Sequence, residues 1–141
     1  MNIFQKGTLV ALRIALGWLY FWAGITSVLN ANWSAAGYLN SAKLFPGLYH
    51  WLASPTLLPI TNLVNQWGLT LLGASLILGL FVRWTTLAGV VIMALYYLAL
   101  GFPHPNPHAF IVDEHIIYIA TLLTLNALNA GRIWGLDSRF K

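Results

Sequence analysis

The sequence predicts an all-α fold: an integral membrane bundle of four helices, with an interfacial helical loop between helices 1 and 2. Hydrophobic residues make up 59% of the 141 residues and charged residues 7%, against roughly 25% charged in an ordinary soluble domain. Mean hydropathy is +0.73. Runs such as LTLLGASLILGLFV do not alternate in polarity, as the strands of a membrane barrel would.

Four stretches with at most two charged residues each have room for a spanning helix of about 20 residues. We expect these spans at about residues 7–29, 63–82, 84–102 and 113–130. At about 1.5 Å per residue, each covers on the order of 27–35 Å, which matches a hydrocarbon core of about 30 Å. The first span is too long and too rich in Trp and Tyr for a signal peptide. No shift in composition marks a boundary, so residues 1–141 are predicted to form a single domain.

The connection between the first two spans, residues 31–62, is rich in Trp, Tyr and Leu and carries three prolines. It is too apolar for a free linker, so we expect one or two short helices lying on the membrane surface. Its aromatic residues would then lie at headgroup level: Trp33, Tyr38, Tyr49 and Trp51.

The last connection, residues 103–112, contains PHPNPH. Proline fixes φ and removes backbone donors, so this segment should be a stiff, extended strap. Asp113 follows it and is expected to be the N-cap of the fourth helix, with Glu114 in the first turn near the positive end of the helix dipole.

The distribution of basic residues predicts the orientation of the protein in the membrane. Six of the seven lysines and arginines flank one side of the spans and only Lys43 lies on the other. The positive-inside rule therefore predicts a multi-pass protein of the cell (plasma) membrane, surrounded by lipid, with both termini in the cytoplasm. No basic stripe suggests nucleic-acid binding, and the absence of cysteine excludes a dithiol mechanism.

Glycines recur along the first three spans, at positions where helices should touch. Small residues allow the backbones of neighbouring membrane helices to approach closely. We expect this packing role at Gly17, Gly24, Gly68, Gly73, Gly79 and Gly89.

Counting depth along the helices brings several polar and aromatic groups to one outer layer. Glu114 and His115 lie just above Tyr118, Tyr97 and Trp22, and Glu114 shares a helix face with Tyr118. A carboxylate, an imidazole and phenols in an aromatic pocket could supply protons to an amphiphilic carbonyl compound such as a quinone. The alternative is structural: the two acids cap a helix and the aromatic residues form an interfacial belt.

On the cytoplasmic side, Arg13 lies at the same level as Asn126. A charge at this depth is costly unless it is paired or reaches the headgroups. Arg13 is therefore expected to hydrogen-bond Asn126 as a strut, to snorkel, or to bind a ligand.

A metal or haem site is not predicted. His104 and His108 are separated by prolines that prevent a shared helix face. Transmembrane haem needs two histidines within the bundle, and only His115 approaches it.

Five segments, in this order and spacing, resemble the DoxX/DoxD family of small four-helix membrane proteins, and most closely its DoxD branch: LRIALGWLYFWAGITSVL, WSAAGYLNSA, LGASLILGLFVRWTTLAG, DEHIIY and IWGLDSRF. The resemblance implies the membrane subunit of thiosulfate:quinone oxidoreductase, which joins two thiosulfates into tetrathionate and passes two electrons to a quinone beside a small DoxA-type subunit. The chain resembles the DoxD portion alone. The resemblance implies functional positions at Arg13, Arg83, Asp113, Glu114 and His115.

The leading hypothesis is thus a quinone-linked membrane oxidoreductase subunit. Its expected catalytic residues are Glu114, His115 and Asp113, and its expected quinone-binding residues are Arg13, Trp22, Tyr97, Tyr118 and Arg83. Quinone is the expected electron acceptor, and a DoxA-like subunit or a second copy in a homo-oligomer is an expected partner. The alternatives are a non-catalytic scaffold for a redox complex and a small-solute transporter.

Overall fold

The computed structural model describes residues 1–103 and 107–140, and every regular element within them is a helix. Four long helices form the body: α1 (Ile3–Leu29), α4 (Leu58–Leu78), α5 (Val82–Leu100) and α6 (Glu114–Ala127). Between α1 and α4 lie two short helices, α2 (Ala36–Asn40) and α3 (Pro46–Leu52), and two 3₁₀ turns, η1 (Ala130–Arg132) and η2 (Leu136–Arg139), follow α6. The predicted all-α class is confirmed for this part of the chain.

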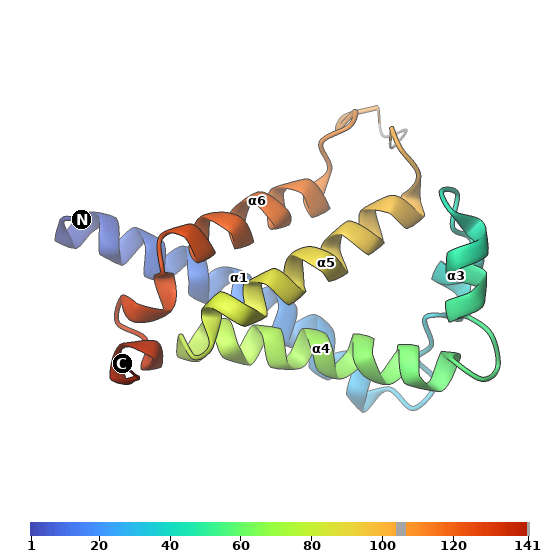
Figure 1. The fold of residues 1–141 in the computed structure, drawn as a ribbon, viewed down its shortest axis with the longest axis horizontal. Helices are drawn as coiled ribbons and strands as arrows, with labels where there is room; N and C mark the ends of the chain where they lie inside the picture. The colour runs from blue at the N-terminus through green and yellow to red at the C-terminus, as the bar shows by residue number, and fades with distance from the viewer. Residues whose placement is uncertain (104–106, 141) are drawn as a thin grey trace.

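The two ends of the molecule are formed by different parts of the chain (Figure 1). Both termini and the α4–α5 turn lie at one end, here called the terminal end. α3 and the α5–α6 connection lie at the opposite end, here called the loop end. His104, Pro105 and Asn106 of the predicted strap lie outside the described residues.

Two of the long helices, α1 and α5, are long and apolar enough to cross a membrane, judged by length and composition. α6 has 14 residues, which cover about 21 Å, less than a hydrocarbon core of about 30 Å. It ends earlier than the expected residue 130, because Asn129 adopts a left-handed backbone with φ of 48°. α4 also lies earlier than the expected residues 63–82, because Gly79 ends it in a left-handed conformation with φ of 66°.

Glycines let α1 and α4 touch at the backbone. A Cβ added to Gly73 would overlap the backbone of Phe21, and one added to Gly24 would overlap the backbone of Thr70. The expected packing role is therefore confirmed at these two positions. A Cβ on Gly68 would meet only the side chain of Ile92, at an ordinary contact distance of 3.6 Å.

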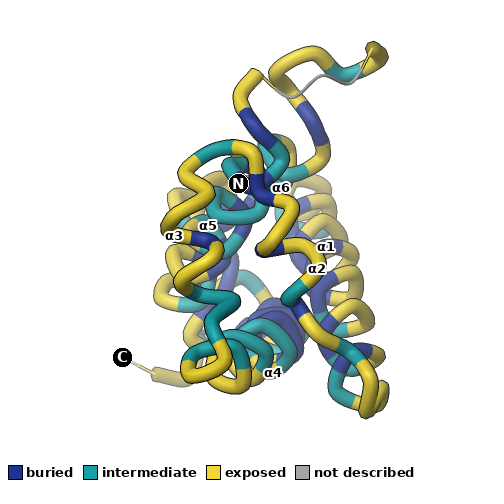
Figure 2. Tube along the Cα trace, turned by 90° about the vertical axis from the view of Figure 1, so that its right-hand side faces the viewer, coloured by how far each residue is buried: buried dark blue, intermediate teal, exposed yellow. Residues whose placement is uncertain are grey.

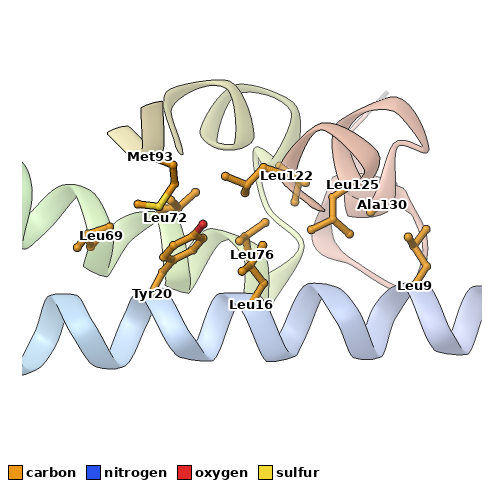
Figure 3. Close-up of a cluster of buried hydrophobic side chains, with 11 residues drawn as sticks. Leu9, Leu16, Tyr20, Leu69, Leu72, Leu76, Met93, Leu122, Leu125 and Ala130 are labelled. Carbon is orange, nitrogen blue, oxygen red and sulfur yellow. The ribbon is translucent and has the colours of Figure 1, made fainter. Parts of the chain in front are cut away.

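The core between the long helices is apolar (Figure 3). Leu76, Leu122 and Leu125 have no exposed surface. Asn126 links α6 to α5, since its Nδ2 donates to the carbonyl of Arg83 at 2.7 Å and to the hydroxyl of Thr86 at 2.8 Å. These contacts hold α5 and α6 side by side over α1 and α4.

α2 and α3 cover the loop end and are here called the cap (Figure 2). The Tyr49 hydroxyl donates to the carbonyl of Leu95 at 2.5 Å, and the Tyr38 hydroxyl to the carbonyl of Tyr96 at 2.6 Å. The prediction of short helices in this loop is confirmed. Tyr49 was expected at headgroup level, but it is buried, because its hydroxyl finds its partner on α5.

Candidate functional site

Asp113 caps α6 at the loop end, as its position after the proline strap predicts. Its carboxylate accepts hydrogen bonds from the backbone N–H groups of His115 at 3.0 Å and Ile116 at 3.3 Å. Burial alone would raise the pKa of this carboxyl, but hydrogen bonds from the His115 ring and from these two N–H groups outweigh burial and hold the pKa below its usual range. Asp113 is therefore a fixed anion at neutral pH.

The His115 ring is held by this anion. Its Nδ1 lies 2.7 Å from Oδ2 of Asp113, and the two side chains are 14% and 7% exposed. Because an ionised carboxylate can only accept, Nδ1 carries the proton of that bond. The second nitrogen, Nε2, makes no hydrogen bond within residues 1–103 and 107–140.

Two tyrosines adjoin this imidazole, and two more extend the row of rings. His115 packs edge-on against Tyr96 of α5, with ring centroids 6.0 Å apart, and against Tyr118, at 6.4 Å. Tyr118 in turn meets Tyr20 of α1 at 5.9 Å, and Tyr96 meets Tyr38 of the cap at 5.8 Å. A continuous row of rings thus runs from the core to the cap.

One end of this row is a buried phenol. Tyr20 is 2% exposed, and its hydroxyl has no hydrogen-bond partner among the described residues. Figure 3 shows Tyr20 among the leucines of the core. Beyond it, Leu16, Leu72 and Leu76 fill the space toward the terminal end. This apolar layer does not favour a polar solute path through the bundle.

A cavity of about 270 Å³ lies between the cap and helices α4 and α5, and is here called the cap cavity. It is larger than an apolar cavity of ~150 Å³ that accommodates benzene. Most of its lining is apolar, and its polar side chains are Tyr38, Tyr49, Thr61, Asn65 and Tyr96. Trp51, Ile60 and Val64 line it and are also largely exposed, so its mouth opens sideways between α3 and α4.

Asn65 and Tyr96 form a hydrogen-bonded pair in the wall of the cap cavity. The Tyr96 hydroxyl donates to Oδ1 of Asn65. The Asn65 amide nitrogen keeps two N–H donors, which make no hydrogen bond within the described part of the chain. Burial raises the pKa of the Tyr38 phenol above its usual range, so this cavity wall presents neutral hydrogen-bonding groups.

The structure brings together some of the residues expected at the outer site. Asp113, His115 and Tyr118 are in contact, whereas the neighbouring Glu114 is exposed. Tyr97 does not face the cap cavity. Its hydroxyl donates to the carbonyl of Ile111 at 2.5 Å and its ring packs on Phe102, because it projects about 100° around α5 from Tyr96.

Trp22 does not join the site either. It is 56% exposed and stacks on Trp18, one turn earlier, with ring centroids 5.8 Å apart. Depth along a helix correctly places Trp22 at this level, but it does not decide which face the side chain occupies. The outward face lies away from the cap cavity.

Arg13 and Arg83 lie at the terminal end, far along the helices from the cap. Arg13 is buried, and its Nη1 donates to the carbonyl oxygens of Ala130 at 2.5 Å and Ile133 at 3.0 Å. The expected hydrogen bond from Arg13 to Asn126 is not formed, because η1 folds back over the bundle and Asn126 turns to α5. Arg83 is exposed.

Sequence reasoning missed Tyr96, Tyr20 and Tyr38 as members of the site. A helical face could have identified Tyr96, since it lies four residues after Ile92 and both line the cap cavity. Among the described residues, no group of three potential metal ligands occurs. The phenol, amide and imidazole groups that meet here can donate hydrogen bonds.

No protein-family model, curated protein or solved structure matches this chain.

Proposed function

We propose that this chain is a multi-pass membrane protein that binds a quinone in the cap cavity and acts as the quinone-reducing subunit of a thiosulfate-oxidising complex. The membrane assignment is supported by the length and apolar composition of α1 and α5. α4 and α6 complete the proposed bundle. Both termini lie at one end, which agrees with the basic residues that flank that side.

The main support for the proposed quinone site is the cap cavity. Its apolar lining suits a quinone ring and the start of an isoprenoid tail. The N–H donors of Asn65 lie in its wall and could bind a quinone carbonyl. Its mouth, at Trp51, Ile60 and Val64, opens at the side of α4, where a lipid-soluble ligand would arrive from the membrane.

Thiosulfate as electron donor rests on the DoxD-like segments. When bound, a quinone accepts two electrons and two protons, so two thiosulfates, one quinone and two protons give one tetrathionate and one quinol. In residues 31–62 and 103–112, Lys43 is the one lysine or arginine. We therefore propose that a partner, such as a small DoxA-like subunit, supplies most of the positive charge that attracts the dianion.

Binding can be tested directly with decylubiquinone, followed by quenching of tryptophan fluorescence in detergent. Ile92→Phe should fill the cap cavity and weaken binding by about tenfold or more, since the side chain lines it. Val91→Phe is the matched control, because this residue is exposed at the preceding position of α5. Equal affinities for both variants would contradict the assignment of the cavity.

The complete reaction needs a separate measurement. Purified protein, with and without a co-purifying small subunit, is supplied with thiosulfate and decylubiquinone, and quinol and tetrathionate are quantified. We expect tetrathionate and quinol in equal amounts when the subunit is present. Quinone binding without thiosulfate oxidation under either condition would remove thiosulfate from the proposal and leave a quinone-binding membrane protein.

A further inference from the structure

The wall that separates the cap cavity from the outer surface contains a row of proton-bearing groups. Tyr96 lines the cavity and hydrogen-bonds Asn65 there. The Tyr96 ring also lies perpendicular to the His115 ring, with ring centroids 6.0 Å apart. His115 is 14% exposed, which gives the imidazole access to outer water while most of it stays within the protein.

Asp113 determines which nitrogen of this imidazole can deliver protons. The carboxylate is fixed by two backbone N–H groups and by Nδ1 of His115. This bond assigns the proton on Nδ1 and leaves Nε2 as the nitrogen that exchanges protons. The arrangement resembles, in its roles, a base whose tautomer is set by an adjacent carboxylate.

We propose that His115, oriented by Asp113, delivers protons from the outer water through the Tyr96 hydroxyl to a quinone bound in the cap cavity. Tyr96 is then the catalytic residue, since it touches the ligand, and His115 and Asp113 are positioning residues that act through it. This inference rests on the proposed quinone site.

The proton and electron balance of this step is complete. The electron donor gives two electrons to the quinone and is itself oxidised. The quinone oxygen that contacts Tyr96 gains the proton that leaves the Tyr96 hydroxyl, and the opposite quinone oxygen takes its proton from solvent. Tyr96 is reprotonated from Nε2 of His115, and His115 is reprotonated from water at the loop end.

Few other titratable groups face this path in the described residues. Asp113 and Glu114 lie at the start of α6, Tyr118 lies one turn further along α6, and Tyr38 of the cap faces Tyr96. Glu114 is exposed and belongs to the same outer surface from which protons are taken. The pH response of the path should therefore be lost when the His115 imidazole is removed.

The test uses the full chain in excess over decylubiquinone, so that all the quinone is bound, with dithionite as the electron donor. Stopped-flow absorbance gives the rate of quinol formation between pH 5 and pH 9. Wild type should lose rate as pH rises, because fewer protons are available in the outer water. His115→Gln should bind quinone with unchanged affinity yet reduce it about 10²-fold more slowly, with the pH dependence flattened. Tyr96→Phe should slow the reduction of bound quinone to a similar extent.

Tyr97→Phe is the matched control, because it removes a phenol from the adjacent position that faces Phe102 instead of the cavity. It should keep the wild-type rate and pH profile. Free imidazole added to His115→Gln should restore part of the rate, which a purely structural role would not allow. Asp113→Asn should lower the rate less than His115→Gln, because it leaves the imidazole in place.

A second readout does not depend on rate. The infrared difference spectrum between oxidised and reduced quinone should contain histidine ring bands in wild type, and these bands should be missing in His115→Gln. Bound quinone with an unchanged pH profile and unchanged bands in His115→Gln would overturn the relay alone. Failure of wild type to bind decylubiquinone would overturn the quinone site and the relay together.

Discussion

The guanidinium Nη1 of Arg13 lies 2.5 Å from the carbonyl oxygen of Ala130, although 117 residues separate them. This bond fastens the C-terminal segment to the first helix. A cation that was expected to face a neighbouring helix or the headgroups instead binds backbone carbonyls that follow α6. The C-terminal segment thereby covers the terminal end of the bundle.

The first prediction follows from this bond. Arg13→Leu should release the C-terminal segment and increase hydrogen exchange in residues 130–140, with a loss of about 1–3 kcal/mol in unfolding free energy. Asn126→Leu should leave that exchange unchanged, because Asn126 bonds Arg83 and Thr86. The effects of the two substitutions should add within about 0.5 kcal/mol. A strong energetic coupling between the two substitutions would instead indicate that Arg13 hydrogen-bonds Asn126.

The second prediction concerns Asp137, which caps α5 from a distance. Its carboxylate accepts from the N–H groups of Phe81 at 2.6 Å and Val82 at 3.0 Å. Asp137→Ala should lower the unfolding free energy by about 1–2 kcal/mol, whereas Asp137→Asn should retain most of the stability, because asparagine also caps helices well. Thermal denaturation in detergent measures both, and equal losses would argue against the cap.

The third prediction compares two glycines of α4. Gly73→Ala should disrupt the α1–α4 contact, because the new methyl group would overlap the backbone of Phe21, whereas Gly68→Ala meets only a side chain at 3.6 Å. We expect Gly68→Ala to be neutral or to stabilise by up to about 1 kcal/mol, the usual gain of alanine over glycine in a helix. Chemical denaturation of both variants checks this order.

The fourth prediction is a pH dependence. The pKa of Asp113 is lower in the folded protein than its ordinary value of 3.8, so its contribution to stability is fully present above that value and is lost as pH falls through the folded pKa. Melting temperature should therefore fall more steeply below about pH 4 in wild type than in Asp113→Asn. Parallel curves for the two proteins would contradict the shift.

Helix content and the Asp113 cap could be predicted because they depend on local signals, namely apolar runs, prolines and an Asp before a helix. The site could be predicted only in part. Counting depth brought His115 and Tyr118 together correctly, but it did not distinguish Tyr96 from Tyr97. These neighbours differ by about 100° around α5, and packing against α2 and α4 decides which one faces the cavity.

The partners of Arg13 were beyond prediction for a different reason. They depend on η1 and η2 folding back over the terminal end, and backbone carbonyls leave no mark in the sequence. Tyr49 is a similar case, since its hydroxyl bonds a carbonyl on α5. Aromatic composition predicted an interfacial belt and gave no sign of this inward contact.

Orientation in the membrane is the fifth prediction. The chain has no cysteine, so single cysteines can be introduced without background. Asn32→Cys and Ser138→Cys, both at exposed positions, should react with an impermeant maleimide from opposite sides in intact cells and inverted vesicles. Labelling of both from the same side would contradict the proposed topology.

Photolabelling tests the central claim, a quinone site beneath the cap, most directly. An azido derivative of decylubiquinone is irradiated with the purified protein, and the modified residues are identified by mass spectrometry. We expect adducts on residues that line the cap cavity, above all Asn65 and Tyr96, and competition by unmodified decylubiquinone. Adducts confined to the outward face of α1, at Trp18 and Trp22, or labelling that decylubiquinone does not reduce, would contradict the site.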